Sequence, residues 1–186
     1  PTITTGVPTP ASPYCAGASI TVPYTITGIF TGGNIFTAQL SNSGGSFASP
    51  VNIGTLSSTI AGNISCTIPG GTTTGAGYLI RVVSSTPVVT GSSTAAFTIN
   101  ALSVPTISIF AVPPGPICAG TNVTFTASIT NGGASPFYQW QINGSNVASG
   151  STYSSSNFSN NDFGTCVLTS NDACANPTTA TSNSIT

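Results

Sequence analysis

Two stretches with the same opening decide the fold: YCAGASITVPYTITG at residues 14–28 and ICAGTNVTFTASIT at residues 117–130. They align without a gap, and Cys118 follows Cys15 by 103 residues. After each Cys-Ala-Gly, apolar and polar residues alternate. The apolar positions are Ile20, Val22 and Tyr24 in the first stretch and Val123, Phe125 and Ala127 in the second. Such alternation is typical of a β-strand with one buried face, so the chain is predicted to contain two copies of an all-β unit.

The other segments of the first copy are also short alternating runs, bounded by Gly, Pro, Ser and Asn. They read NIFTAQLS (34–41), PVNIGTL (50–56), GNISCTIP (62–69), GYLIRVV (77–83) and AAFTIN (95–100). No segment repeats its apolar residues every 3.6 positions between helix start and stop signals, so we expect no helix. Units of about 90 to 100 residues suit a β-sandwich. We therefore predict two tandem sandwich domains, at residues 1–101 and 102–186.

Charged residues are almost absent, at 2% of the chain against about 25% in ordinary proteins. The inventory is Arg81, Asp162 and Asp172, with no His. General acid-base catalysis needs a group that titrates near the working pH, and a Ser-His-Asp arrangement cannot be built without His. The Cys residues are scattered singly, which does not suit a zinc site. The sequence therefore predicts a protein that is not an enzyme and needs no cofactor or metal.

The small number of charged residues also limits the kinds of partner that the chain can bind. Binding to nucleic acid requires clustered Lys and Arg, so we expect no nucleic-acid partner. No apolar run reaches about 18 residues, so we expect no membrane insertion. A net charge of −1 leaves little repulsion between copies, which favours self-association in a fibre or surface layer. The alternative is a soluble module kept dispersed by glycans or by a charged remainder of a longer polypeptide, of which we expect this chain to be a piece.

The stretch NNDFGTCVLTS (160–170) resembles the D-x-G-x-Y-x-C run that enters strand F of immunoglobulin-like domains. Asp162 and Gly164 keep the register, whereas Cys166 stands at the Tyr position and Leu168 at the Cys position. Trp140, in FYQWQING (137–144), falls where strand C carries its buried Trp, and the Asn-Gly that follows predicts a tight turn. The resemblance implies an immunoglobulin-like sandwich.

Two further core positions follow from this resemblance. Ala127 takes the place of the strand B cysteine, so Ala127 and Leu168 are expected to fill the space beneath Trp140 that a disulfide would occupy. In the first unit, IPGGTTTGAGYLIRV (68–82) resembles the E-to-F corner of a fibronectin-III-like sandwich. There Tyr78 is the expected corner tyrosine, and Arg81 is expected to be a solvated charge.

Longer phrases carry a narrower resemblance: SPYCAGASITVPYTITGIF, GSFASPVNIGTL, GYLIRVVSSTP and CAGTNVTFTASITNGGASPFYQWQINGSNV. They are similar to the tandem repeats of very long cell-surface proteins of Bacteroidota, which are exported by the type IX secretion system and include gliding-motility adhesins. The resemblance implies an extracellular location at the cell surface. Because such repeats serve as stalks, filaments and adhesive surfaces alike, it does not choose among these roles.

Five cysteines in a chain of extracellular type, without His, indicate disulfides. Strands B and F run in the same direction, which places Cys118 and Cys166 at one end of the second sandwich and Cys174 about 20 Å away at the other. A disulfide requires Cα atoms within about 7 Å. A bond is therefore predicted between Cys118 and Cys166, leaving Cys174 free or bonded to a neighbouring domain or subunit. In the first unit Cys15 precedes strand B and Cys66 lies near the foot of the neighbouring strand E, so a bond is predicted between Cys15 and Cys66. The rival pairing joins Cys118 to Cys174 and leaves Cys166 as a buried thiol.

The leading functional prediction is a structural repeat of an extracellular filament or surface stalk that associates with copies of itself. The alternative is an adhesin module that binds a glycan or a solid surface through loops at the sandwich ends. Trp140 would stack on sugar if it were exposed, but its strand C register favours the core. A third possibility is that the N-terminal PTITT (1–5) completes the sheet of a neighbouring subunit.

Overall fold

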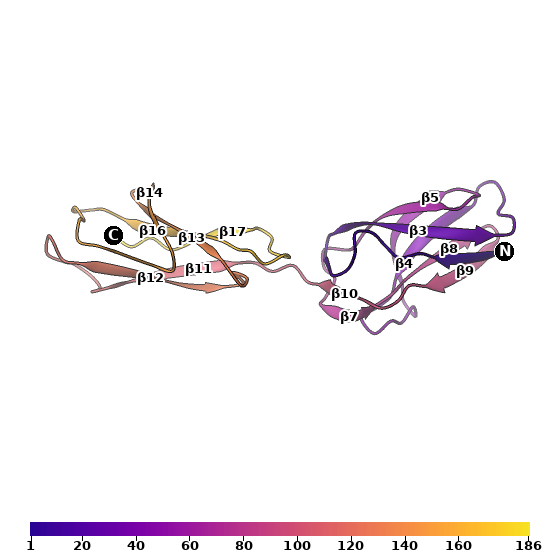
Figure 1. Cartoon of the computed structure of the whole chain (residues 1–186), viewed down its shortest axis with the longest axis horizontal. Coiled ribbons are helices and arrows are strands. Elements are labelled where there is room, and N and C mark those ends of the chain that lie inside the picture. Colours follow the sequence, from indigo (N-terminus) through magenta and orange to yellow (C-terminus); the bar gives the residue numbers. More distant parts are fainter. The chain divides into compact units, whose positions relative to one another are not determined.

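The structure is a computed structural model that describes all 186 residues. It consists of seventeen β-strands and no helix, which confirms the predicted all-β class (Figure 1). The chain divides into two compact units, Pro1–Leu102 and Ser103–Thr186, one residue from the expected boundary. None of its elements is a helix of the length and apolarity needed to cross a membrane.

The first unit is a sandwich of ten strands. They are β1 (Thr2–Thr5), β2 (Tyr14–Cys15), β3 (Ser19–Thr27), β4 (Ile35–Leu40), β5 (Val51–Ser57), β6 (Gly62–Thr67), β7 (Gly75–Tyr78), β8 (Ile80–Ser85), β9 (Val88–Ser93) and β10 (Phe97–Asn100). The sheets have the strand orders β1-β3-β6, β2-β10-β7 and β5-β4-β8-β9. All the alternating runs singled out in the sequence contribute to these strands.

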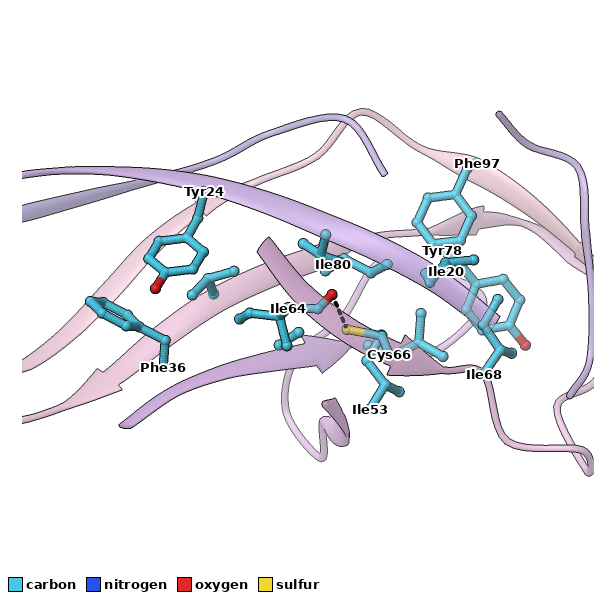
Figure 2. Packing of buried hydrophobic residues seen from close by; sticks show 14 of the residues in the cluster. Ile20, Tyr24, Phe36, Ile53, Ile64, Cys66, Ile68, Tyr78, Ile80 and Phe97 are labelled. Atoms are coloured by element: carbon cyan, nitrogen blue, oxygen red, sulfur yellow. Dashed lines mark hydrogen bonds between the residues drawn. The ribbon is translucent and has the colours of Figure 1, made fainter. Parts of the chain in front are cut away.

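The alternation of apolar and polar residues along the strands determines which side chains form the core of the first unit, which Figure 2 shows from close by. The inward residues of β3 are Ile20, Val22 and Tyr24, and those of β4 are Phe36, Ala38 and Leu40. The rings of Tyr24 and Phe36 lie 4.4 Å apart between their centroids, so the two strands meet through aromatic contact. Apolar residues at every second position thus face a common interior.

The N-terminal strand already belongs to its own unit. β1 pairs antiparallel with β3, from Thr2 opposite Thr27 to Thr5 opposite Tyr24. The Thr5 hydroxyl accepts a hydrogen bond from the Val82 N–H at 2.9 Å, which ties β1 to β8. PTITT thus pairs within its own unit as the edge strand of the β1-β3-β6 sheet, and its pairing with a neighbouring subunit stays a prediction.

The second unit has seven strands. They are β11 (Thr106–Val112), β12 (Val123–Thr130), β13 (Phe137–Ile142), β14 (Ser145–Ser149), β15 (Thr152–Ser155), β16 (Gly164–Thr169) and β17 (Thr179–Thr181). The sheets are β11-β12-β15 and β14-β13-β16-β17. The Asn183 side chain covers the open edge of β11, since it accepts the Ile109 N–H at 2.8 Å and donates to the Ile109 carbonyl at 3.1 Å.

The two sequence copies adopt the same local conformation. Ala18 N–H donates to the Cys15 carbonyl, and Thr121 N–H donates to the Cys118 carbonyl, in both cases at 3.1 Å. Each turn passes through a glycine with positive φ, 83° in the first and 81° in the second, and then enters β3 or β12. Glycine adopts this conformation without the steric cost that a Cβ brings, so the shared Cys-Ala-Gly encodes a shared turn.

Candidate functional site at one end of the second unit

Trp140 is a core residue of the second unit. It is fully buried on β13, and its Nε1–H donates to the Gly150 carbonyl at 2.8 Å. Its ring lies 5.9 Å from that of Phe125 and 6.3 Å from that of Tyr153. A side chain that is enclosed on all sides cannot present its face to a sugar, so the structure places Trp140 in the core rather than on an adhesive surface.

The other predicted core residues differ in depth. Leu168 is fully buried, whereas Ala127 is only partly buried and packs against the cluster that contains Trp140. In the β13–β16 ladder Trp140 lies opposite Cys166, and Leu168 lies opposite Tyr138. Cys166, at the tyrosine position of the strand F motif, is therefore the direct cross-strand neighbour of Trp140.

Tyr78 occupies the corner of the first unit. It is buried, and its hydroxyl donates to the carbonyl of Thr73, five residues earlier, at 2.8 Å. A tyrosine hydroxyl that bonds the backbone a few residues upstream defines the tyrosine corner of immunoglobulin-like sandwiches. This hydrogen bond closes the connection between β6 and β7.

The cysteine pairing differs from the prediction. Cys66, Cys118 and Cys166 are free thiols, whereas Cys15 and Cys174 are the disulfide-bonded residues. Neither the bond between Cys15 and Cys66 nor the bond between Cys118 and Cys166 is present. The rival bond between Cys118 and Cys174 is absent for the same reason.

Strand orientation explains both missing bonds. Cys66 faces the interior of the first unit opposite Ile20 of β3, and Cys15 belongs to a different sheet beside β10. In the second unit Cys118 is exposed in the turn before β12, whereas Cys166 is buried two residues into β16. Burial raises the pKa of the Cys66 thiol to about 12 and that of the Cys166 thiol to about 11. Both buried thiols are therefore protonated at neutral pH and unreactive.

The two carboxylates hold loops in place. Asp162 accepts hydrogen bonds from the Ser159 N–H at 2.8 Å and from the Asn143 side chain at 2.7 Å, and these bonds lower its pKa. The Asn143 carboxamide also accepts the Phe163 N–H, which joins the Asn-Gly turn between β13 and β14 to the start of β16. That turn has φ of 51° and 78° at its two central residues, as the sequence predicts for a tight Asn-Gly hairpin.

Asp172 performs the same task at the other end of the unit. It accepts hydrogen bonds from the Cys174 N–H at 3.0 Å and from the Ser103 hydroxyl at 2.8 Å, and these bonds lower its pKa. Ser103 N–H in turn donates to the Cys174 carbonyl. The loop that carries Cys174 is thereby attached to the first residue of its unit. Nowhere do three His, Cys, Asp or Glu side chains gather in a way that could hold a metal ion.

Arg81 is not a solvated charge. It is partly buried on β8, where its Nε–H donates to the Gln39 side chain at 3.0 Å. Its guanidinium carbon lies 4.3 Å from the centre of the Phe47 ring, within the range of a cation–π interaction. No pattern in the sequence connects Phe47 to Arg81, because the contact depends on how the loop before β5 folds back.

The main hollow of the second unit lies at the end where β12 begins. It measures about 500 Å³, and its apolar walls include Val123, Phe125, Phe158 and Ile185. The turn that carries Cys118 and the loop at residues 159–162 form its rim. The unit contains no Lys or Arg, so the hollow offers no cation to an anionic ligand and suits an uncharged group with an apolar face. Sequence patterns do not reveal this hollow, because it is built from two loops distant in sequence.

Solved structures give weak likenesses to the chain as a whole. The human OSCAR ligand-binding domain covers 100% of this chain and 97% of its own, at 12% identity and a TM-score of 0.39. The three N-terminal domains of the highly immunogenic outer capsid protein Hoc of bacteriophage RB49 cover 98% of this chain and 57% of theirs, at 15% identity and a TM-score of 0.40. The FN1–FN3 domains of chicken CNTN1 cover 97% and 65%, at 11% identity and a TM-score of 0.35.

These TM-scores lie below 0.5 and therefore assign neither a family nor a function. Neither a protein-family model nor a curated protein sequence matches the chain. The immunoglobulin-like architecture accordingly rests on the strands, sheets and tyrosine corner described above.

Proposed function

We propose that this chain is a non-catalytic structural repeat of an extracellular filament or surface stalk. The observation that carries the proposal is the scarcity of charge: the chain has only Arg81, Asp162 and Asp172 as charged side chains and a net charge of −1. So small a charge provides little repulsion between copies in solution, and charge repulsion is what normally disperses small proteins.

The exposed apolar side chains support association. Several are more than two-thirds exposed: Val7, Ile29, Ile60 and Val88, all in the first unit. Single exposed apolar residues are ordinary, but here they occur on a unit whose one charged side chain is the partly buried Arg81. Contacts between copies would bury these residues and gain the corresponding hydrophobic free energy.

An extracellular location is part of the proposal. Disulfide-bonded Cys15 and Cys174 favour an oxidising compartment, because cytosolic thiols are normally kept reduced. The resemblance of several sequence phrases to Bacteroidota surface repeats supports export by the type IX system, and with it attachment at the cell surface. Self-association and surface exposure together suit a stalk or filament.

Electron microscopy of native material that contains the chain tests this function. We expect regular fibres or surface projections, which antibodies against the chain should label along their length. Light scattering of the purified chain should show concentration-dependent association that persists in salt, since apolar contacts are not screened by ions. Dispersed, unlabelled material together with a strictly monomeric purified chain would refute the structural role.

A second candidate function is adhesion through the hollow at the end of the second unit. Its apolar walls, with Asp162 as a hydrogen-bond acceptor at the rim, suit a neutral sugar or a similarly neutral surface group. Glycan-array binding that disappears in Phe158→Ser, which alters a wall of the hollow, and persists in Val88→Ser, on the first unit, would support this candidate. Binding that is unchanged in Phe158→Ser would count against it.

A further inference from the structure

Cys15 and Cys118 occupy equivalent turns but differ in bonding. The two turns share the Cys-Ala-Gly sequence, the same backbone hydrogen bond and a glycine with the same sign of φ. Cys15 is nevertheless disulfide-bonded, whereas Cys118 is an exposed free thiol. The first copy thus demonstrates that a cysteine in this turn can reach a disulfide partner.

No partner for Cys118 remains within the chain. Cys15 and Cys174 are already disulfide-bonded, and Cys66 and Cys166 are 3% and 0% exposed. A buried thiol cannot meet an exposed one without unfolding of its sandwich. A disulfide partner for Cys118 must therefore come from another polypeptide.

The surface beside Cys118 has the features of a contact between identical chains. Ile117, directly before it, is 39% exposed and stands at the hollow whose walls include Phe125, Phe158 and Ile185. A two-fold symmetric contact requires one patch that complements itself. An apolar side chain beside a hollow with apolar walls meets that requirement, because each copy can insert its isoleucine between the apolar walls of the other, away from Asp162 at the rim.

We propose that Cys118 forms an intermolecular disulfide with Cys118 of a second copy of this chain, with Ile117 of each copy seated in the hollow of the other. The proposal rests on the proposed extracellular function only for its oxidising environment. Each copy offers one accessible thiol, so the link closes at two chains. It would join two stalks or filaments side by side rather than extend one.

The bond forms by exchange with a small-molecule disulfide. The Cys118 thiolate attacks one sulfur of the oxidant, forms a mixed disulfide and releases the first thiol. The Cys118 thiolate of the second copy then attacks the Cys118 sulfur, forms the bond between chains and releases the second thiol. Two protein thiols are oxidised and one small-molecule disulfide is reduced to two thiols, which carry the two protons.

The experiment uses the purified full chain, incubated with glutathione disulfide and analysed by non-reducing electrophoresis and intact mass. We expect a species of twice 18.3 kDa that reverts with a reductant, and peptide mapping should place the link at Cys118 of both chains. The matched control is Cys118→Ser combined with Ser145→Cys, which moves the thiol to an exposed turn of the same unit. The natural chain should dimerise at least about tenfold faster, because docking raises the effective concentration of the partner thiol.

The variant Ile117→Ser keeps the thiol and removes the apolar side chain, so it should slow dimerisation toward the rate of the control. Four results would each overturn the proposal: a monomer with glutathione attached at Cys118, a rate equal to that of the control, a rate unaffected by Ile117→Ser, or a link at another cysteine. All four results come from the purified chain in solution. The absence of filaments in native material would therefore refute the proposed function but not this inference. Failure of the bond between two Cys118 residues to form would refute this inference but not the proposed function.

Discussion

Trp140 and Cys166 lie directly opposite each other in the β13–β16 ladder, and both are fully buried. The thiol takes the position that a tyrosine holds in the related motif, next to the ring that in antibody domains packs against a disulfide. Phe125 joins the same cluster from the facing sheet. The centre of the second unit is therefore an aromatic and thiol core without a cross-link.

We expect Cys166→Ser to lower the free energy of unfolding of the second unit by about 1 to 2 kcal/mol, because a hydroxyl is more costly to bury beside an indole than a thiol. Trp140 is the sole tryptophan, so its emission during urea unfolding reports this unit specifically. Cys118→Ser is the matched control, since Cys118 is exposed and the change should leave the midpoint in place. Equal midpoints for both variants would contradict the packing described.

The three free thiols should differ sharply in reactivity. In native buffer, Ellman's reagent should label one thiol per chain rapidly, at Cys118, because Cys66 and Cys166 are buried. Raising the pH from 7 to 9 should not make Cys66 or Cys166 react, because burial raises their pKa values to about 12 and about 11. Denaturant should expose both buried thiols to the reagent. Rapid labelling of two or more thiols in the native chain would show that one of the sandwiches is open.

Alternation in the sequence was sufficient to predict the sandwich architecture. The runs that became β3 and β12 carry their apolar residues at every second position, and this pattern requires one buried face whatever the rest of the chain does. The Asn143-Gly144 turn was predictable for a similarly local reason, because a two-residue hairpin needs positive φ at both positions.

The cysteine partners and the hollow were not predictable, because they depend on contacts between distant segments. Knowing that Cys118 precedes β12 and that Cys166 lies near the start of β16 places both near one end of the unit. It does not tell whether either side chain is exposed or faces Trp140. Side-chain direction within a strand alternates, so an error of one position reverses the outcome. The stacking of Arg81 on Phe47 was not predictable either, because it also depends on a contact between distant segments.

Tyr78→Phe should destabilise the first unit by about 1 kcal/mol, the net contribution of one hydrogen bond, because it removes the bond to the Thr73 carbonyl and keeps the ring. Hydrogen exchange of β7 and β8 amides, followed by mass spectrometry, measures this loss within the first unit alone. Tyr153→Phe is the matched control, since the Tyr153 ring packs beside Trp140 and its hydroxyl is not used in a hydrogen bond. If amide exchange in β7 and β8 were identical in the two variants, the hydrogen bond of the tyrosine corner would not contribute to the stability of the first unit.

The two units should respond differently to acid. Both carboxylate side chains belong to the second unit, and the first unit has no Asp, Glu or His. The pKa of Asp162 and that of Asp172 are lowered in the folded chain from the ordinary value of 3.8 by the hydrogen bonds that each accepts. Below that value the unfolded chain binds more protons than the folded one, so the stabilisation is present above pH 3.8 and is lost as the pH falls through the folded pKa values.

We therefore expect urea midpoints from Trp140 emission to decrease between pH 5 and pH 2, while amide exchange free energies in β3 and β8 stay constant over the same range. The double variant Asp162→Asn with Asp172→Asn should flatten most of the pH dependence of the second unit, because neutral side chains of the same shape cannot titrate. A parallel loss of stability in the first unit would contradict this account, because no side chain there titrates between pH 2 and pH 7. An unchanged slope in the double variant would show that the loop bonds of the two carboxylates do not stabilise the fold.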